Sequence, residues 1–251
     1  MGRIGAILDT RSLITDGNLP SMSIRGDIEF HDVRLSFDGN RNVLHNITLR
    51  IPAGTSLGIV GSVGSGKSSL ASLIPRMYDA TSGSVRIDGS DVRSYRLMDL
   101  RAGIAVVPQE AFLFSDTIAE NIRFGNPAAS DEQVRHAASL ACLDADIQQL
   151  PLGYETVVGE RGVTLSGGQK QRTSLARAII SDPEILILDD SLSAVDAATE
   201  EQILHGLDIV KQNRTTIIIS HRISTVQRCT TIIVLQDGSI VEEGTHAELV
   251  A

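Results

Sequence analysis

The stretch "GSVGSGKS", residues 61–68, decides the fold. It begins at the last residue of the apolar run "SLGIVG", which has the pattern of a fully buried strand. It is followed by a stretch with helical character. In this context the pattern G-x-x-x-x-G-K-S indicates a phosphate-binding loop, or P-loop. The glycines let backbone N–H groups turn toward a phosphate chain, and the helix N-terminus adds partial positive charge. The sequence therefore predicts a nucleotide-binding α/β domain.

Two side chains of this loop carry its chemistry. We expect Lys67 to reach the terminal phosphates of a nucleotide and the Ser68 hydroxyl to ligate Mg²⁺. The alternative is a glycine-rich turn with a surface lysine. The residues predicted to bind the nucleotide here are Gly61, Ser62, Val63, Gly64, Ser65, Gly66, Lys67, Ser68 and Ser69.

A second aliphatic run, "EILILDD", ends in two consecutive acids, Asp189 and Asp190. Chemistry at a P-loop requires a carboxylate at the end of a neighbouring strand to hold Mg²⁺, directly or through water. Asp189 stands where that carboxylate is needed. Taken alone, the same run could be a core strand followed by a helix N-cap. Downstream of a P-loop, the Mg²⁺ role is the better interpretation.

The stretch "LSGGQ", residues 165–169, indicates the start of another helix. Ser166 and Gln169 have the spacing of a capping box. Gly167 and Gly168 leave the N-terminus of that helix bare enough to approach an anion closely. We therefore predict a second phosphate-binding helix end, although an ordinary helix cap fits the same residues.

The rest of the chain alternates strands and helices. Residues 27–51 have the apolar–polar alternation of antiparallel strands, and residues 116–180 are predominantly helical in pattern. "TTIIISH" reads as a buried strand, and "TIIVLQDGSIVEEG" as a hairpin that turns at Asp237 and Gly238. The predicted fold is an α/β, RecA-like P-loop core with a mostly parallel sheet, an N-terminal antiparallel β subdomain and an inserted helical subdomain at about 110–180. Residues 1–23 are predicted to be a linker, and residues 24–251 the domain.

Composition limits the function. The chain has 251 residues, of which 42% are hydrophobic, but no apolar run approaches the ~20 residues of a membrane-spanning helix, so we expect the chain alone to be soluble. A net charge of -9 argues against a general nucleic-acid binder. Cys142 and Cys229 fit neither a disulfide framework nor a C-x-x-C metal site, and a reducing cytoplasm is the expected compartment.

Six motifs in a fixed order resemble the nucleotide-binding domain of an ATP-binding cassette (ABC) transporter, from residue 27 to the C-terminus. "GSVGSGKS" resembles the Walker A motif, "VVPQE" with Gln109 the Q-loop, and "LSGGQ" the family signature. "ILILDD" resembles Walker B, "SAVD" with Asp196 the D-loop, and "ISHR" with His221 the switch region. The resemblance implies ATP and Mg²⁺ as ligands. "GERG" resembles the loop that touches coupling helices in exporters, and "GRIGAILDT" resembles the tail that joins the last membrane helix to the cassette.

The resemblance also implies roles for single residues. Phe37 corresponds to the aromatic residue, usually Tyr, that stacks on adenine; a core position is the alternative for it. Gln109 is implied to help ligate Mg²⁺ together with Ser68 and Asp189, and His221 to contact the γ-phosphate. In this family ATP is sandwiched between two cassettes. The residues implied to act in trans, on the ATP of the partner cassette, are Ser166, Gly167, Gly168, Gln169 and Asp196.

Asp190 departs from the family pattern, which usually has Glu after the Walker B aspartate. The shorter side chain withdraws the carboxylate by about 1.5 Å, and a displacement of about 1 Å in a positioned catalytic group can cost on the order of 100-fold in rate. The catalytic candidates are Asp190, His221 and Gln109. Because the side chain of Asp190 is short, we predict that ATP hydrolysis at this site is slow. "DDSLSAVD" resembles the less active half of asymmetric exporters, so we expect a heterodimer with a different cassette, attached to a transmembrane domain at the cytoplasmic face of the plasma (inner) membrane.

Four alternatives remain open at this point. They are a homodimeric exporter cassette with ordinary ATPase activity, an importer cassette, a nucleotide-binding regulatory module, and a soluble ABC ATPase that acts on nucleic acid or ribosomes. The exporter-like tail disfavours the importer. The acidic charge and the absence of a second cassette from the sequence disfavour the last alternative.

Overall fold

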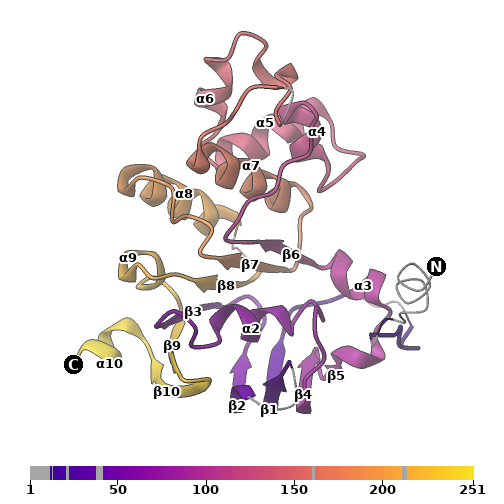
Figure 1. Ribbon diagram of the computed structural model, residues 1–251, viewed down its shortest axis with the longest axis vertical. Coiled ribbons are helices and arrows are strands. Elements are labelled where there is room, and N and C mark those ends of the chain that lie inside the picture. Colours follow the sequence, from indigo (N-terminus) through magenta and orange to yellow (C-terminus); the bar gives the residue numbers. More distant parts are fainter. Residues whose placement is uncertain (1–11, 13, 21–22, 38–41, 160–161, 211–213) are drawn as a thin grey trace, which may run out of the picture.

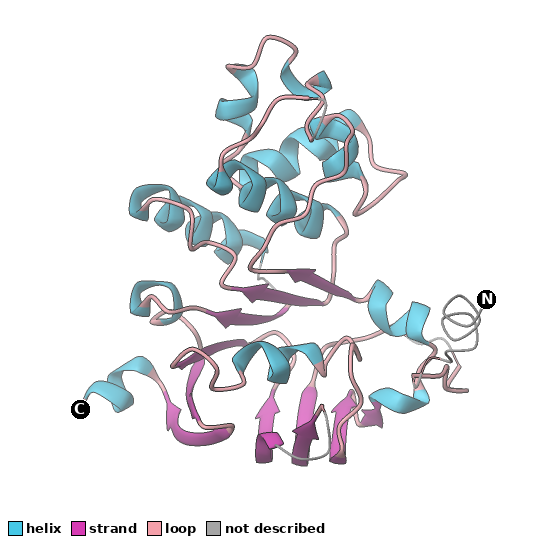
Figure 2. Ribbon diagram, in the orientation of Figure 1, coloured by secondary structure: helices cyan, strands magenta, loops and turns pink. Residues whose placement is uncertain are grey.

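The computed structural model describes residues 1–251 except 1–11, 13, 21–22, 38–41, 160–161 and 211–213. It has two sheets and a separate helical layer (Figure 1). Figure 2 shows that the layer beyond strand β6 consists of helices and loops. The predicted α/β fold with an antiparallel and a mostly parallel sheet is confirmed.

The first sheet is antiparallel and has the strand order β2-β1-β4-β5. Its strands are β1 (Ile28–Ser36), β2 (Asn42–Ile51), β4 (Ser82–Ile87) and β5 (Ser90–Asp91). Buried and exposed positions alternate along much of β1 and β2, as expected for strands with one face on the core.

The second sheet has the strand order β10-β9-β3-β8-β7-β6. Its strands are β3 (Ser56–Gly61), β6 (Ile104–Val107), β7 (Ile185–Asp189), β8 (Thr215–Ile219), β9 (Thr231–Gln236) and β10 (Ser239–Gly244). All neighbouring pairs are parallel except β9 and β10, which form the predicted hairpin. Asp237 and Gly238 both have positive φ in its turn, and a Cβ on Gly238 would lie 2.3 Å from the carbonyl oxygen of Val43. Only glycine therefore fits this turn against β2.

The helices follow the predicted pattern where they are long. They are α2 (Lys67–Ser72), α3 (Leu97–Ala102), α4 (Ile118–Arg123), α5 (Asp131–Leu140), α6 (Asp144–Gln148), α7 (Gly167–Ile180), α8 (Ala197–Val210), α9 (Ile223–Val226) and α10 (His246–Val250), with 3₁₀ turns η1 (Val92–Ser94) and η2 (Gly153–Glu155). Within the described ranges, no helix has both the length and the apolar character needed to cross a bilayer. Helix α2 is short, since Pro75 cannot supply a backbone N–H to extend it.

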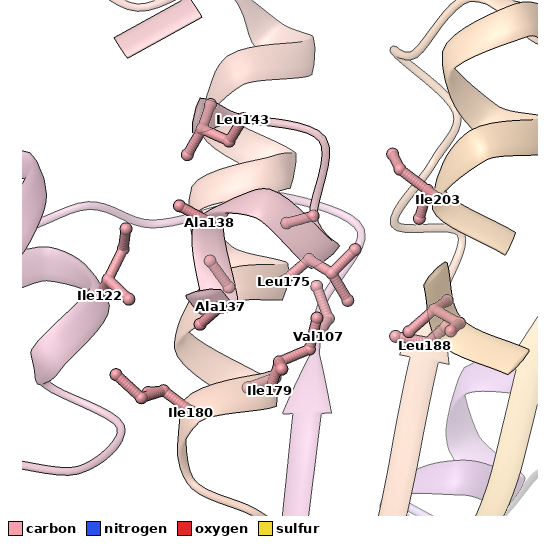
Figure 3. Close-up of a cluster of buried hydrophobic side chains, with 14 of the residues drawn as sticks. Val107, Ile122, Ala137, Ala138, Leu143, Leu175, Ile179, Ile180, Leu188 and Ile203 are labelled. Carbon is pink, nitrogen blue, oxygen red and sulfur yellow. The ribbon is translucent and has the colours of Figure 1, made fainter. Parts of the chain in front are cut away.

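Two hydrophobic clusters hold these layers together. One joins β1, β2 and β4 to β3 through the buried side chains of α2, so this helix lies between the two sheets. The other joins the helical layer to β6 and β7. Figure 3 shows Leu175 and Ile179 of α7 beside Val107 of β6, with Ile122 of α4 on the far side of Ala137 and Ala138. Helix α7 is therefore the element through which the helical layer is fixed to the sheet.

Candidate functional site

The predicted phosphate site is a pocket of about 350 Å³ at the carboxyl ends of β3, β7 and β8. Ligand sites in open α/β sheets lie outside this edge. The pocket is lined by Val43, Val63, Gly64, Gly66, Lys67, Ser68, Ser69, Gln109, Asp189, Asp190, Ile219 and His221. The structure therefore brings the P-loop, the Q-loop, both acids of Walker B and the switch histidine together.

The backbone of the P-loop has the conformation that its glycines permit. Gly64 has φ +81° and Gly66 has φ +100°, values that other residues rarely adopt. A Cβ on Gly64 would meet nothing within 4 Å, whereas one on Gly66 would lie 3.0 Å from the carbonyl oxygen of Val43. Gly64 thus leaves open space beside the loop, and Gly66 allows the close approach of β2 just before α2.

Lys67 is 6% exposed and folds back over the loop. Its Nζ donates hydrogen bonds to the carbonyl oxygens of Gly61 at 2.9 Å and Ser62 at 2.8 Å. Burial lowers the pKa of this ammonium, and the negative charges of Asp189 and Asp190 partly oppose that shift. The Lys67 ammonium is a poorly hydrated cation, so the approach of an anion such as a phosphate stabilises its charged form.

Ser68 and Asp189 form the metal side of the pocket. The Ser68 hydroxyl donates to Oδ1 of Asp189 at 3.0 Å. Burial raises the pKa of the Asp189 carboxyl and the charge of Asp190 adds to this, while the Ser68 hydrogen bond opposes it. A divalent cation would stabilise the ionised forms of two carboxylates in one partly buried site.

The donor set fits Mg²⁺. In the described part of the chain, no group of three or more His, Cys, Asp and Glu side chains could hold a metal ion. Mg²⁺ does not require such a cage, because it keeps several waters and is commonly bound by one or two protein oxygens together with substrate phosphates. Ser68, Asp189 and Gln109 offer hydroxyl, carboxylate and amide oxygens in this pocket. These three residues would hold the ion.

Asp190 and Gln109 form a second polar pair. Strand β7 ends at Asp189, and Asp190 has φ +44° while its N–H donates to the carbonyl oxygen of Ile219 at 2.9 Å. Its Oδ2 accepts a hydrogen bond from Nε2 of Gln109 at 3.2 Å. The Asp190 carboxylate therefore faces the same pocket as Lys67, and the exposed His221 lines the pocket as well.

The capping box of the "LSGGQ" stretch is present. The Ser166 hydroxyl oxygen accepts the backbone N–H of Gln169 at 3.2 Å, and Oε1 of Gln169 accepts the backbone N–H of Ser166 at 3.0 Å. Ser166 and Gly167 are exposed, and neither lines the P-loop pocket of the same chain. The exposed Asp196 also lies outside that pocket and caps α8 through the N–H of Thr199.

Phe37 is 55% exposed, so the alternative of a core phenylalanine is wrong. Its ring lies 4.9 Å from that of Tyr78 in an edge-to-face arrangement. Phe37 does not line the P-loop pocket. Glu160 and Arg161 of "GERG", and residues 1–11 with the tail motif, lie outside the described residues.

Sequence reasoning missed several residues that shape the site. Val43 and Ile219 line the pocket without any motif of their own. Glu200 is 3% exposed and pairs with Arg222, next to His221. Asp146 of α6 contacts Gln169. A buried glutamate on a helix and a short acidic helix carry no local signal, because their partners are distant in sequence.

A P-loop at the edge of a parallel sheet, with Ser68 against Asp189 and a lysine buried in the loop, defines a P-loop nucleotide-binding domain. The model of the ABC transporter family matches residues 44–193, more than half of the chain. The chain therefore belongs to the ABC transporter family, and it corresponds to the ATPase domain of such a transporter.

The chain is 45% identical over 249 residues to the ATP-dependent lipid A-core flippase of Desulfotalea psychrophila (strain LSv54 / DSM 12343), covering 98% of this chain and 43% of the flippase. It is 44% identical over 241 residues to multidrug resistance protein homolog 65 of Drosophila melanogaster, covering 95% of this chain and 18% of that protein. A solved structure described as a bacterial Atm1-family ABC exporter with ATP bound superimposes with a TM-score of 0.95 at 40% identity, covering all of this chain and 44% of that one. The chain thus spans less than half the length of these relatives, which include exporters.

Proposed function

We propose that this chain is the ATP-binding and ATP-hydrolysing motor domain of an ABC exporter, working with Mg²⁺ at the cytoplasmic face of the plasma (inner) membrane. The relatives named as a flippase and an exporter support this proposal, and each is more than twice as long as the matched region. The chain would act with a transmembrane domain, on the same or another polypeptide, and with a second cassette. Closure of the two cassettes around ATP would reorient the membrane helices.

The position of the signature supports a dimer. Ser166 and Gly167 are exposed at the start of the fourteen-residue helix α7, away from the P-loop pocket of their own chain. The N-terminus of a helix attracts anions through its free N–H groups and its dipole. In our proposal Ser166, Gly167, Gly168, Gln169 and Asp196 face the ATP held by the P-loop of the partner cassette, with Phe37 stacked on the adenine of its own ATP.

Each residue of the P-loop pocket would have its own role in ATP binding or hydrolysis. Lys67 would exchange its two bonds to loop carbonyls for bonds to phosphate oxygens, which places its charge where negative charge develops. Ser68, Asp189 and Gln109 would hold Mg²⁺, which neutralises phosphate charge when it is bound. His221 would contact the γ-phosphate, and Asp190 would orient the attacking water.

The side chain of Asp190 supports the finer part of the proposal, which is slow hydrolysis at this site. The carboxylate of Asp190 faces the pocket beside Gln109. The side chain that carries it is one methylene shorter than the Glu that is usual in this family. A general base must come within hydrogen-bond reach of its water. We infer that this P-loop site binds Mg-ATP and hydrolyses it slowly. The chain would then serve a different cassette by completing a faster site with its intact "LSGGQ".

A homodimeric cassette with ordinary turnover is the second candidate. One observation favours it: a single chain carries both the P-loop lysine, Lys67, and the intact capping box of Ser166 and Gln169. Two copies could therefore form two complete composite sites.

Turnover of Mg-ATP by the 251-residue chain, measured per chain over a wide range of chain concentrations, separates the candidates. For a heterodimer half, we expect the turnover of the chain alone to stay far below about 10 s⁻¹, the value of a median enzyme, at every concentration. We also expect acceleration when the chain is mixed with a cassette that has Glu at the position of Asp190. Fast turnover by the chain alone, with a rate per chain that rises in proportion to concentration before it saturates, would establish the homodimer instead.

A complementation experiment tests the composite site itself. One chain carries Lys67→Ala, which removes the phosphate-binding lysine but leaves the signature intact. The other carries Asp190→Glu together with Ser166→Asp, which keeps a good helix cap but repels phosphate at the signature. Each chain alone is expected to be inactive, while an equal mixture regains turnover. A mixture no more active than its components would contradict binding across the dimer.

A further inference from the structure

Helix α6 contributes one carboxylate to the signature helix. Oδ1 of Asp146 accepts a hydrogen bond from Nε2 of Gln169 at 3.2 Å. Oδ2 of the same carboxylate accepts one from Nη1 of Arg172 at 2.6 Å. Gln169 and Arg172 lie one turn apart on α7, so a single side chain holds the first two turns of this helix.

The bond to Gln169 determines which way its amide points. The capping box requires the amide oxygen, Oε1, to accept the N–H of Ser166. An amide rotated by half a turn would present its NH₂ group to that N–H, and the box would be lost. A carboxylate accepts hydrogen bonds but donates none when ionised, so Asp146 selects the orientation with NH₂ toward α6 and the oxygen toward Ser166.

Arg172 makes this arrangement compatible with an anion at the helix start. An unpaired carboxylate close to the N-terminus of α7 would repel a phosphate. Arg172 pairs with Asp146, and its side chain is only 12% exposed and also donates to the carbonyl oxygen of Cys142. Helix α7 has no acidic residue of its own in its first turn. The partial positive charge at its N-terminus is therefore left for a ligand.

We propose that Asp146 is a positioning residue for the signature: by fixing the Gln169 amide and neutralising itself with Arg172, it presents Ser166 and Gly167 to the ATP of the partner cassette. The inference rests on the proposed function, because it requires the signature to act across the dimer. It assigns part of the composite site to α6, which carries none of the six ordered motifs.

Asp144 provides a matched control on the same short helix. Its carboxylate accepts hydrogen bonds from the Tyr154 hydroxyl and from Nε2 of Gln148, both at 2.6 Å. Neither partner belongs to α7. Asp144→Asn therefore makes the same chemical change on α6 without touching the signature helix.

The test uses the complementing pair described above, in which only one composite site is active. Asp146→Asn is placed either in the Lys67→Ala chain, which donates the signature, or in the Asp190→Glu, Ser166→Asp chain, which donates the P-loop. In the signature donor we expect the KM for Mg-ATP to rise about fivefold, the effect of one lost hydrogen bond. In the P-loop donor, and for Asp144→Asn in either chain, we expect less than about a twofold change.

Each result has a distinct meaning. An equal effect of Asp146→Asn in both chains would show a general loss of folding and would overturn the positioning role, as would no effect in either chain. Melting temperatures of the separate variants check this independently, since the proposal expects Asp146→Asn and Asp144→Asn to melt within a few °C of each other. If the parent mixture without any change on α6 has no activity, the function across the dimer fails, and the role of Asp146 fails with it.

Discussion

The Nε2 atom of Gln109 lies 3.2 Å from Oδ2 of Asp190, although the two residues are 81 positions apart in the chain. Gln109 follows β6 and Asp190 follows β7, and these strands are parallel neighbours, so their carboxyl ends deliver both side chains to one pocket. The contact ties the Q-loop to the residue that would position the attacking water.

Asp189→Asn is expected to stabilise the chain when neither nucleotide nor Mg²⁺ is present. Burial raises the pKa of Asp189, so the folded chain binds this proton more tightly than the unfolded chain does. Stability from this group is therefore present at low pH and is lost as pH rises from the unfolded value of about 3.9 through the raised folded value. An amide cannot ionise, yet its oxygen still accepts the Ser68 hydrogen bond. We expect the melting temperature at neutral pH to rise by on the order of 2 °C, with a smaller difference below about pH 4.

The same Asp189→Asn variant should lose the metal-dependent part of ATP binding. A ligand at 100 times its Kd stabilises the folded state by about 2.7 kcal/mol. With wild type, adding Mg²⁺ to ATP should raise the melting temperature beyond ATP alone, and EDTA should reverse this. With Asp189→Asn the Mg²⁺ increment should disappear while that of ATP alone remains. An undiminished Mg²⁺ increment would remove Asp189 from the metal site.

Gly66→Ala is expected to destabilise the P-loop more than Gly64→Ala. Both glycines have positive φ, which costs a residue with a Cβ about 1–2 kcal/mol. The Cβ on Gly66 would also meet Val43 and Leu44 at about 3 Å, whereas the Cβ on Gly64 meets nothing. Urea unfolding should show Gly66→Ala less stable than Gly64→Ala by at least about 1 kcal/mol. Equal losses would mean that β2 moves away freely and that the close approach at Gly66 is unimportant.

Phe37→Ala is expected to weaken ATP binding about tenfold, because stacking of a base on an aromatic ring contributes on the order of 1–3 kcal/mol. Phe37→Tyr should bind ATP within about twofold of wild type, since stacking needs only the ring face. Phe124→Ala removes an equally exposed ring from the helical layer and should have no effect. Calorimetric titration with ATP measures all three. An unchanged affinity for Phe37→Ala would exclude the stacking role.

Glu200→Ala is expected to destabilise the fold by about 3 kcal/mol. The Glu200 carboxylate is 3% exposed, pairs with Arg222 and accepts a hydrogen bond from the Thr225 hydroxyl. Arg222 also donates to the carbonyl oxygens of Ser193 and Val195, so the pair joins the D-loop to the segment that carries His221. Urea unfolding gives the loss, with Glu201→Ala, 73% exposed at its side chain, as the control near zero. A loss below about 1 kcal/mol would show that solvent replaces the pair.

The sequence predicted the elements that have strong local signals. The P-loop, the buried strands β3, β7 and β8, the Asp237–Gly238 hairpin and the capping box at Ser166 all follow from patterns within a few residues. Helices α3 and α9 were not predicted, since each has six residues or fewer and no side-chain cap. Helix α10 could have been found, because Thr245 and Glu248 have the spacing of a capping box and form one.

The motif residues that line the P-loop pocket could be predicted from the sequence, but their contacts could not. Lys67, Ser68, Gln109, Asp189, Asp190 and His221 line one pocket, as the ordered motifs imply. The link from Asp146 to Gln169 was not foreseeable, because it depends on how α6 packs against α7 rather than on any periodicity. Tertiary contacts of this kind appear in a sequence only as isolated polar residues with no pattern of their own.

Turnover of Mg-ATP by Asp190→Glu, compared with wild type, shows whether the short side chain of Asp190 limits hydrolysis at this P-loop. We predict that Asp190→Glu raises kcat by about 10–100-fold with little change in the KM for ATP, because ATP and Mg²⁺ are held by other residues. We also predict that the gain appears only at concentrations where two chains associate. Asp190→Asn should remain as slow as wild type or slower. A wild-type chain that is already fast, and that Glu does not accelerate, would contradict the claim and leave the water to be positioned by another residue such as His221.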